Sequence, residues 1–215
     1  DDPFWRWHFW RNIWKDRGKL VTFQLSYRQF SVLACGTVVC LALSLLFNIS
    51  SAAAEDFNPG HIIDDTVFTN ANTLNASQIQ DFLNSKVTSC DTNGTQSASD
   101  FGRSDLTHAQ YAASRGWQAP PYTCLRNFSE GGKSAAQIIY DTAQKYQINP
   151  QVLIVLLQKE QGLVTDTWPL NSQYRTATGY GCPDTAPCDS QYYGLTNQVD
   201  WSGKMFRAIM NASPT

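Results

Sequence analysis

The sequence predicts a mainly α-helical domain with long, disulfide-pinned loops, preceded by a transmembrane or signal helix. Apolar residues recur at helical spacing in two adjacent stretches, 134–148 and 149–164. Four cysteines lie among polar, loop-like segments after residue 55, and an uncharged run covers residues 30–49. A length of 215 residues allows one domain of moderate size plus appendages.

Charge is distributed unevenly along the chain. Residues 1–54 carry six Lys/Arg and three Asp/Glu, a net of +3, and residues 55–215 carry ten and fifteen, a net of −5. The run 30–49 is long enough to cross a bilayer as a helix, and basic residues precede it. By the positive-inside rule, residues 55–215 are exported. An acidic main domain argues against nucleic acid as its partner.

The fate of the apolar run stays open. Residues 51–54 are small and form a cleavage site that would leave Glu55 as the mature N-terminus. The leader is long for a cleaved signal, so a retained membrane anchor through residues 30–49 is the alternative. The chain then divides into a cytoplasmic aromatic and basic leader (1–29), an anchor or signal peptide (30–54), an N-terminal exported region (55–130) and a helical domain (131–215).

The exported cysteines predict disulfides. Their number is even, as expected for an oxidising compartment, and three pairings are possible. The favoured pairing joins Cys182 to Cys188 across a short loop with two prolines, and Cys90 to Cys124 across a longer segment. A zinc site is disfavoured because the spacing lacks a C-x-x-C pair and no histidine is near. No metal and no cofactor is therefore expected.

The most informative stretch is 149–164. Asn149 and Pro150 form a helix start signal, and Gly162 suits the end of the helix. Six apolar residues follow the start, so the helix is predicted to be buried all round. Glu160 lies in its last turn, on the face of two leucines, where apolar surroundings would raise its pKa and suit a general acid. The alternative is that Glu160 lies in solvent next to Lys159.

Other helices are predicted from capping signals and apolar spacing. The segment 88–105 is rich in Ser, Thr, Asn, Asp and Gly and is predicted to be a loop. The predicted helices cover 77–87, a short segment from 108 ended by Gly116, 134–148 after a capping box at Ser134, and 202–210. In the last of these, Met205, Phe206 and Ile209 lie on one face.

A long irregular segment, 165–191, follows the central helix. Loops of that length inside a compact domain are usually functional. Its aromatic rings suit stacking on sugar faces, or alternatively fill a minor core. The candidate substrate-binding aromatics here and just beyond are Trp168, Tyr180 and Tyr193.

Two short motifs support a family comparison. The chain has E-Q-G at 160–162, at the end of an apolar helix, and G-L-T-N-Q at 194–198. In this order they resemble the motifs of lysozyme-like lytic transglycosylases and goose-type lysozymes. The resemblance implies a lysozyme-like helical fold, with Glu160 as the catalytic general acid and Gly194, Leu195 and Gln198 as substrate-binding cleft residues.

The resemblance also implies an enzyme that cleaves β-1,4 glycosidic bonds, with peptidoglycan or a related aminosugar polymer as partner. Gln161 replaces the family's usual serine, Asn197 is an extra residue in the second motif, and the third motif has no match before Thr215. The chain is therefore expected to be a fragment of a longer protein. A non-catalytic cell-wall binding or adhesion module with a degenerate lysozyme-like fold is the alternative, and a membrane-anchored structural part of an envelope complex is a third.

Overall fold

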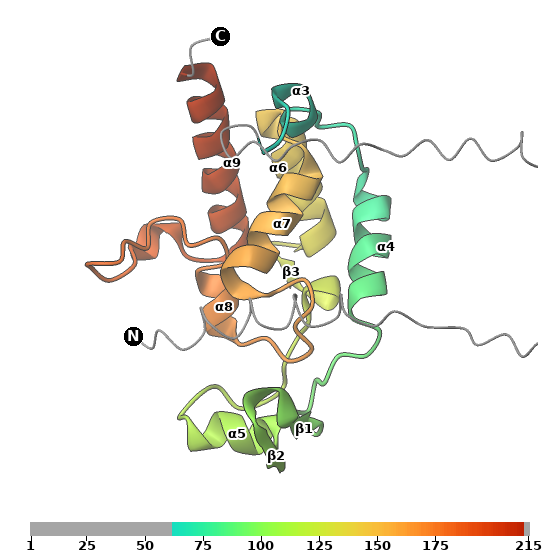
Figure 1. The fold of residues 1–215 in the computed structure, drawn as a ribbon, viewed down its shortest axis with the longest axis vertical. Coiled ribbons are helices and arrows are strands. Elements are labelled where there is room, and N and C mark those ends of the chain that lie inside the picture. Colours follow the sequence, from blue (N-terminus) through green and yellow to red (C-terminus); the bar gives the residue numbers. More distant parts are fainter. Residues whose placement is uncertain (1–61, 213–215) are drawn as a thin grey trace, which may run out of the picture. The chain divides into compact units, whose positions relative to one another are not determined.

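The computed structural model describes residues 62–212, which lie within a single compact unit that begins at Asp56 (Figure 1). The predicted leader and the predicted anchor or signal helix, residues 1–54, lie outside the described residues. Within 62–212, no helix is long and apolar enough to cross a membrane. The structure confirms the prediction of a mainly helical domain with two disulfides.

The elements follow one another from α3 to α9, with two small antiparallel hairpins between them. In chain order they are α3 (Asp65–Phe68), α4 (Ala76–Lys86), β1 (Ser97–Ala98), η2 (Ser99–Phe101), β2 (Arg103–Thr107), α5 (His108–Ser114), η3 (Leu125–Asn127), β3 (Ser129–Glu130), β4 (Lys133–Ser134), α6 (Ala135–Tyr146), α7 (Pro150–Gln161), α8 (Asn171–Arg175), η4 (Ser190–Tyr192) and α9 (Leu195–Ala212). Strand β1 pairs with β2, and β3 pairs with β4.

Helix α7 has the boundaries that its local signals predict. The Asn149 side chain accepts a hydrogen bond from the Gln151 backbone N–H, Pro150 takes the first position, and Gly162 ends the helix at φ 69°. The helix is not buried all round, however, because Val155 is 63% exposed while Leu153 and Leu157 are each at most 1% exposed. One face of α7 therefore reaches the surface.

Helix α6 is central to the main core. It packs against α4, α7 and α9, and these helices surround one cluster of buried aliphatic side chains (Figure 1). Its contact with α9 is close at Gly203, where an added Cβ would lie 2.7 Å from Thr142 Cγ2 and 2.8 Å from Tyr146 Cδ2. Glycine at this position lets the two helix backbones approach.

The unit also has a second, smaller core. It lies beside α5 and the β1–β2 hairpin, at one end of the unit (Figure 1). Its centre is Trp168, which is 7% exposed and stacks on the His108 ring with centroids 4.5 Å apart. The predicted loop 88–105 contains β1 and η2 and runs into β2. The prediction missed this hairpin because its polar residues resemble a loop. The contacts of Phe101, between the two strands, with Tyr111 and with the distant Trp168 form only in the folded domain.

Both favoured disulfides are present. Cys90 is bonded to Cys124, and Cys182 to Cys188. The first ties the segment before β1 to the one before η3, beside the small core, and Cys124 is fully buried. The second closes a loop whose intervening residues, 183–187, are all exposed. The two covalent links therefore lie in very different environments.

Candidate binding groove

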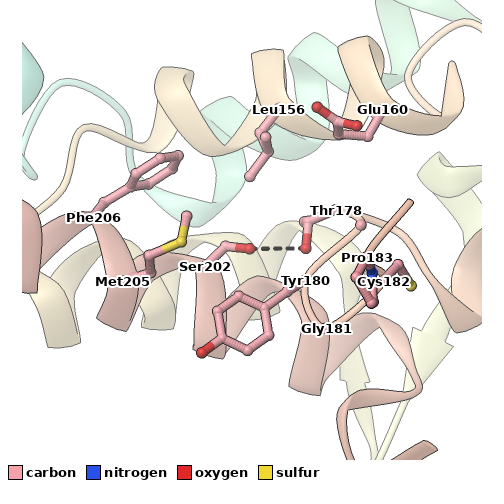
Figure 2. Close-up of a pocket in the computed structure, with 11 residues that line it drawn as sticks. Leu156, Glu160, Thr178, Tyr180, Gly181, Cys182, Pro183, Ser202, Met205 and Phe206 are labelled. Carbon is pink, nitrogen blue, oxygen red and sulfur yellow. Dashed lines mark hydrogen bonds between the residues drawn. The ribbon is translucent and has the colours of Figure 1, made fainter. Parts of the chain in front are cut away.

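A groove of about 450 Å³ opens between α7, α9 and the loop that precedes the second disulfide (Figure 2). We call it the α7–α9 groove. Leu156 and Glu160 approach it from α7, and the side chains from α9 lie opposite. The full lining is Leu156, Glu160, Thr178, Gly179, Tyr180, Gly181, Cys182, Pro183, Ser202, Met205 and Phe206.

Glu160 lies at one end of this groove, but it is not enclosed by leucines. Its side chain is 31% exposed, and Oε1 lies 2.6 Å from the Lys159 ammonium nitrogen. The expectation of a carboxyl held in apolar surroundings is therefore wrong. Glu160 points outward, whereas Leu157 before it is buried. The neighbouring Lys159 supplies a counter-charge, so Glu160 matches the alternative in which it lies in solvent next to that lysine.

Gln198 is placed inside the domain, where it fixes the wall of the groove. It is 0% exposed. Its Oε1 accepts from the backbone N–H groups of Thr178 and Tyr180, each at 3.1 Å. Its Nε2 donates to the carbonyls of Tyr180 and Tyr192 at 2.9 and 2.7 Å. In this structure the amide is therefore committed to the loop and does not face a ligand.

Gly194 and Leu195 start α9 and also have internal partners. Leu195 is fully buried in the main core. Gly194 has φ 99°, and a Cβ there would lie 2.9 Å from Glu130 Oε1. Glu130 Oε2 accepts from the Thr196 backbone N–H at 2.7 Å, so this carboxylate from the β3–β4 hairpin caps α9. The G-L-T-N-Q strip is thus a helix start held by distant residues.

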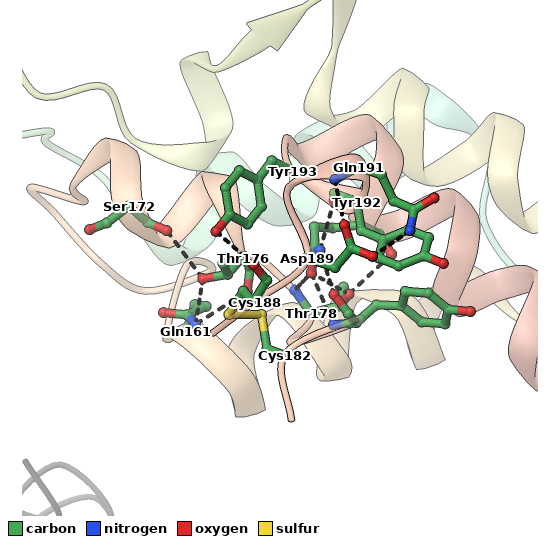
Figure 3. Close-up of a disulfide and its surroundings, with 12 residues drawn as sticks. Gln161, Ser172, Thr176, Thr178, Cys182, Cys188, Asp189, Gln191, Tyr192 and Tyr193 are labelled. Carbon is green, nitrogen blue, oxygen red and sulfur yellow. Dashed lines mark hydrogen bonds between the residues drawn. A yellow bond between two sulfur atoms is a disulfide. The ribbon is translucent and has the colours of Figure 1, made fainter. Parts of the chain in front are cut away.

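The three candidate aromatic residues are not brought together. Trp168 belongs to the small core, as the alternative for this loop expected. Tyr180 lines the groove and stacks on Trp201 with centroids 5.7 Å apart. Tyr193 lies at the foot of the disulfide loop, where its hydroxyl donates to the Cys188 carbonyl at 3.2 Å (Figure 3). Only Tyr180 of the three reaches the groove.

The Cys182–Cys188 loop borders the groove and is supported at its base (Figure 3). The Asp189 N–H donates to the Gly181 carbonyl at 2.8 Å, and Cys182 N–H donates to the Gly179 carbonyl at 3.1 Å. A Cβ on Gly181 would lie 2.3 Å from a ring carbon of Tyr192, so only glycine fits this contact. The loop is therefore anchored while its tip stays open to solvent.

The apolar face predicted for residues 202–210 lies on α9. The periodicity correctly puts Met205, Phe206 and Ile209 on one face, yet Met205 is 39% and Ile209 is 54% exposed. The sequence signal for this exposed surface was the apolar periodicity of these three residues. Periodicity shows that residues share a face, but it does not show whether another element covers that face.

Two carboxyl groups in or near the small core have pKa values shifted in opposite directions. Burial alone would raise the pKa of Asp91, but hydrogen bonds from the Gln96 and Thr95 N–H groups and from His108 outweigh it, so the pKa lies below its ordinary value. His108 uses Nδ1 for this 2.8 Å contact, and its buried Nε2 has no hydrogen-bond partner in the described part of the chain. The pair links α5 to the segment before β1.

Asp166 is the second of these carboxyls. Burial raises its pKa above the ordinary value, against hydrogen bonds from Gln173 Nε2 at 2.8 Å and the Trp168 N–H at 2.9 Å. Desolvation is the largest influence at Asp166, and only two donors oppose it, whereas at Asp91 four donors outweigh it. Among residues 62–212 no group of three or more His, Cys, Asp or Glu side chains is arranged to hold a metal ion.

These features define a class: a small, mainly helical domain with two disulfides, an aromatic minor core and an open apolar groove. The chain belongs to the family of the LasA N-terminal domain, whose model matches residues 61–209, more than half of the 215 residues. No match is found among curated proteins or among solved structures. The disulfides and the family both fit a protein that works outside the cytoplasm.

The family match corrects the lysozyme-like resemblance. The matching family is that of the LasA N-terminal domain, which is neither lysozyme-like nor that of the lytic transglycosylases. The glycosidase function implied by that resemblance is therefore wrong, and so is its non-catalytic, degenerate lysozyme-like variant. The E-Q-G and G-L-T-N-Q motifs misled because short helix-end and helix-start sequences recur for structural reasons. Here Gly162 ends α7, and Gly194 and Gln198 secure α9 and the groove wall.

Proposed function

We propose that this domain is a polypeptide-binding accessory domain of an exported, LasA-type peptidase-related protein. The ligand is a segment of the peptidase part, in the same chain or in another, and it binds in the α7–α9 groove. The proposal starts from the family, because LasA is a peptidase and the chain is related to its N-terminal domain.

The observation that carries the proposal is the apolar lining of an open groove. Leu156, Met205 and Phe206 face it, and all three are at least partly exposed. Ile209, one helical turn beyond Met205 on α9, is 54% exposed, and Val155 on α7 is 63% exposed. Apolar surface that is contiguous and exposed marks interaction sites in soluble proteins, and methionine adapts readily to varied partners.

The lining favours a polypeptide over the aminosugar polymer expected from the sequence. Stacking on sugars requires an aromatic face that is open to the ligand. Trp168 is buried, while Trp201 has Tyr180 stacked at 5.7 Å and the Lys204 ammonium 4.2 Å from its ring centroid. Aliphatic and thioether side chains instead form pockets for the apolar anchors of a protein partner.

The test is isothermal titration calorimetry of the full chain with a purified LasA peptidase domain. We expect saturable binding that Met205→Glu weakens at least about tenfold, because a carboxylate in the groove costs more than one factor of ten in affinity. Ile62→Glu is the control, since Ile62 is 77% exposed and outside the groove. No binding, or equal weakening by both variants, would overturn the proposal.

Peptidoglycan is the second ligand to test, by co-sedimentation with purified sacculi. Under the proposal, the chain binds the peptidase domain more tightly than it binds sacculi. Retention on sacculi without any binding to the peptidase domain would instead make the cell wall itself the partner.

A further inference from the structure

We infer that the α7–α9 groove selects a lysine or arginine side chain of the bound polypeptide. The aliphatic stem would lie along the apolar wall and the charged group would reach Glu160. This inference rests on the proposed function, and it names the chemistry that the groove recognises within it.

The first argument is the state of the Glu160 carboxylate. Its Oε1 pairs with Lys159, and its Oε2 accepts no hydrogen bond from any described residue. Lys159 is 72% exposed and adjacent in sequence, and exposed pairs of this kind contribute little. A ligand cation can therefore bind the free oxygen, or replace Lys159, at small cost.

The second argument is the space in front of this oxygen. The loop passes Glu160 with Gly179 at φ 72°, and a Cβ on that glycine would lie 3.6 Å from Oε2. Even the methyl group of an alanine at position 179 would be in van der Waals contact with this oxygen. Because residue 179 is glycine, no side chain at this position stands beside the carboxylate at the acidic end of the groove.

The third argument is spacing. Leu156 and Glu160 both face the groove from α7, and four residues of helix advance about 6 Å along the axis. The stem of a lysine or arginine covers a comparable length, and such side chains place their methylenes on apolar surface while the charge meets a polar partner. Met205 and Phe206 supply the opposite wall (Figure 2).

The negative net charge of residues 55–215 also favours a basic ligand. Residues 55–215 carry ten basic and fifteen acidic side chains. A domain with this balance attracts basic segments at long range, and the attraction weakens with added salt.

The experiment is an NMR titration of the full chain with four capped amino acids: the Nα-acetyl amides of lysine, arginine, norleucine and glutamine. Norleucine keeps the stem of lysine and lacks the charge. We expect the two basic probes to bind at least about threefold more tightly than norleucine, with shifts at groove residues, and the preference to shrink at about 0.5 M salt.

Glu160→Gln should abolish the preference for basic probes, because it removes the charge and keeps the shape. Asp81→Asn is the matched control: it removes one exposed carboxylate on α4, outside the groove, and should leave the preference intact. Equal affinity for lysine and norleucine, or a preference that survives Glu160→Gln, would overturn the inference.

The two proposals can fail separately. If Met205→Glu weakens binding to the peptidase domain while Glu160→Gln leaves the lysine preference unchanged, the groove binds polypeptide and the selection by Glu160 is wrong. If Met205→Glu has no effect on peptidase binding, the proposed function itself fails.

Discussion

Replacing Gln198 tests how the groove wall is built. The side chain makes four hydrogen bonds to the backbone of the loop, two through Oε1 and two through Nε2. Each intramolecular hydrogen bond contributes about 1 kcal/mol net, and a buried group left without a partner costs about 1–3 kcal/mol. Gln198→Leu keeps the volume and removes these four bonds, together with the one that Oε1 accepts from Thr178 Oγ1 at 3.1 Å. We therefore expect it to lower the free energy of unfolding by about 3–5 kcal/mol.

The assay is urea unfolding followed by tryptophan fluorescence, with amide hydrogen exchange at Tyr180 as a local probe. Asn197→Ala is the control, because Asn197 is exposed and its side chain makes one hydrogen bond, to the Tyr193 carbonyl. That change should cost less than about 1 kcal/mol. A loss for Gln198→Leu no larger than that of the control would refute the structural role of Gln198.

Three further predictions concern pH and redox state. The lowered pKa of Asp91 gives stability above about pH 3.9 that is lost as the pH falls through its folded value, so the penalty of Asp91→Asn in acid unfolding should shrink below pH 4. The raised pKa of Asp166 acts oppositely: its ionisation costs stability as the pH rises above about 4, the unfolded value, towards its folded value. Asp166→Asn should therefore gain relative to wild type as the pH rises above about 4 in the same assay, and no gain would contradict the burial. Mild dithiothreitol followed by alkylation and mass spectrometry should find Cys182–Cys188 reduced before Cys90–Cys124, because thiolate attack needs access and Cys124 is buried. Reduction of Cys90–Cys124 before Cys182–Cys188 would contradict this difference in access.

The elements that sequence reasoning predicted well are those with local signals. Helix α7 is bounded by Asn149, Pro150 and Gly162, and α6 begins after Ser134, whose hydroxyl accepts from the Gln137 N–H. Such caps act within a few residues, so sequence order is enough to place them. The short, proline-containing loop likewise indicated the Cys182–Cys188 pair, and the Cys90–Cys124 pair then joins the two remaining exported cysteines.

The start of α9 was missed because its cap is not local. The predicted helix began at residue 202, whereas α9 begins at Leu195 and is capped by Glu130 from the β3–β4 hairpin. The glycine at 203 also weakens the helical signal in the sequence. No window of neighbouring residues contains the carboxylate that makes this helix start where it does.

The candidate site was the least predictable part. A glutamine in a short motif can face a ligand or the interior, and Gln198 faces the interior. Glu160 does lie at the groove, but it is solvated and ion-paired rather than enclosed. Met205 belongs to the predicted apolar face, and only the structure shows that it is 39% exposed and lines the groove. Side-chain direction and partnering depend on tertiary contacts that spacing does not record.

The central claim is that the α7–α9 groove is where this domain binds polypeptide. The most direct measurement is chemical-shift mapping of the full chain as a purified LasA peptidase domain is added. The account predicts that the largest changes fall on the groove side chains of α7, α9 and the 178–183 loop, and that Met205→Glu removes them. Changes confined to the β1–β2 end of the domain, or no changes at all, would contradict it.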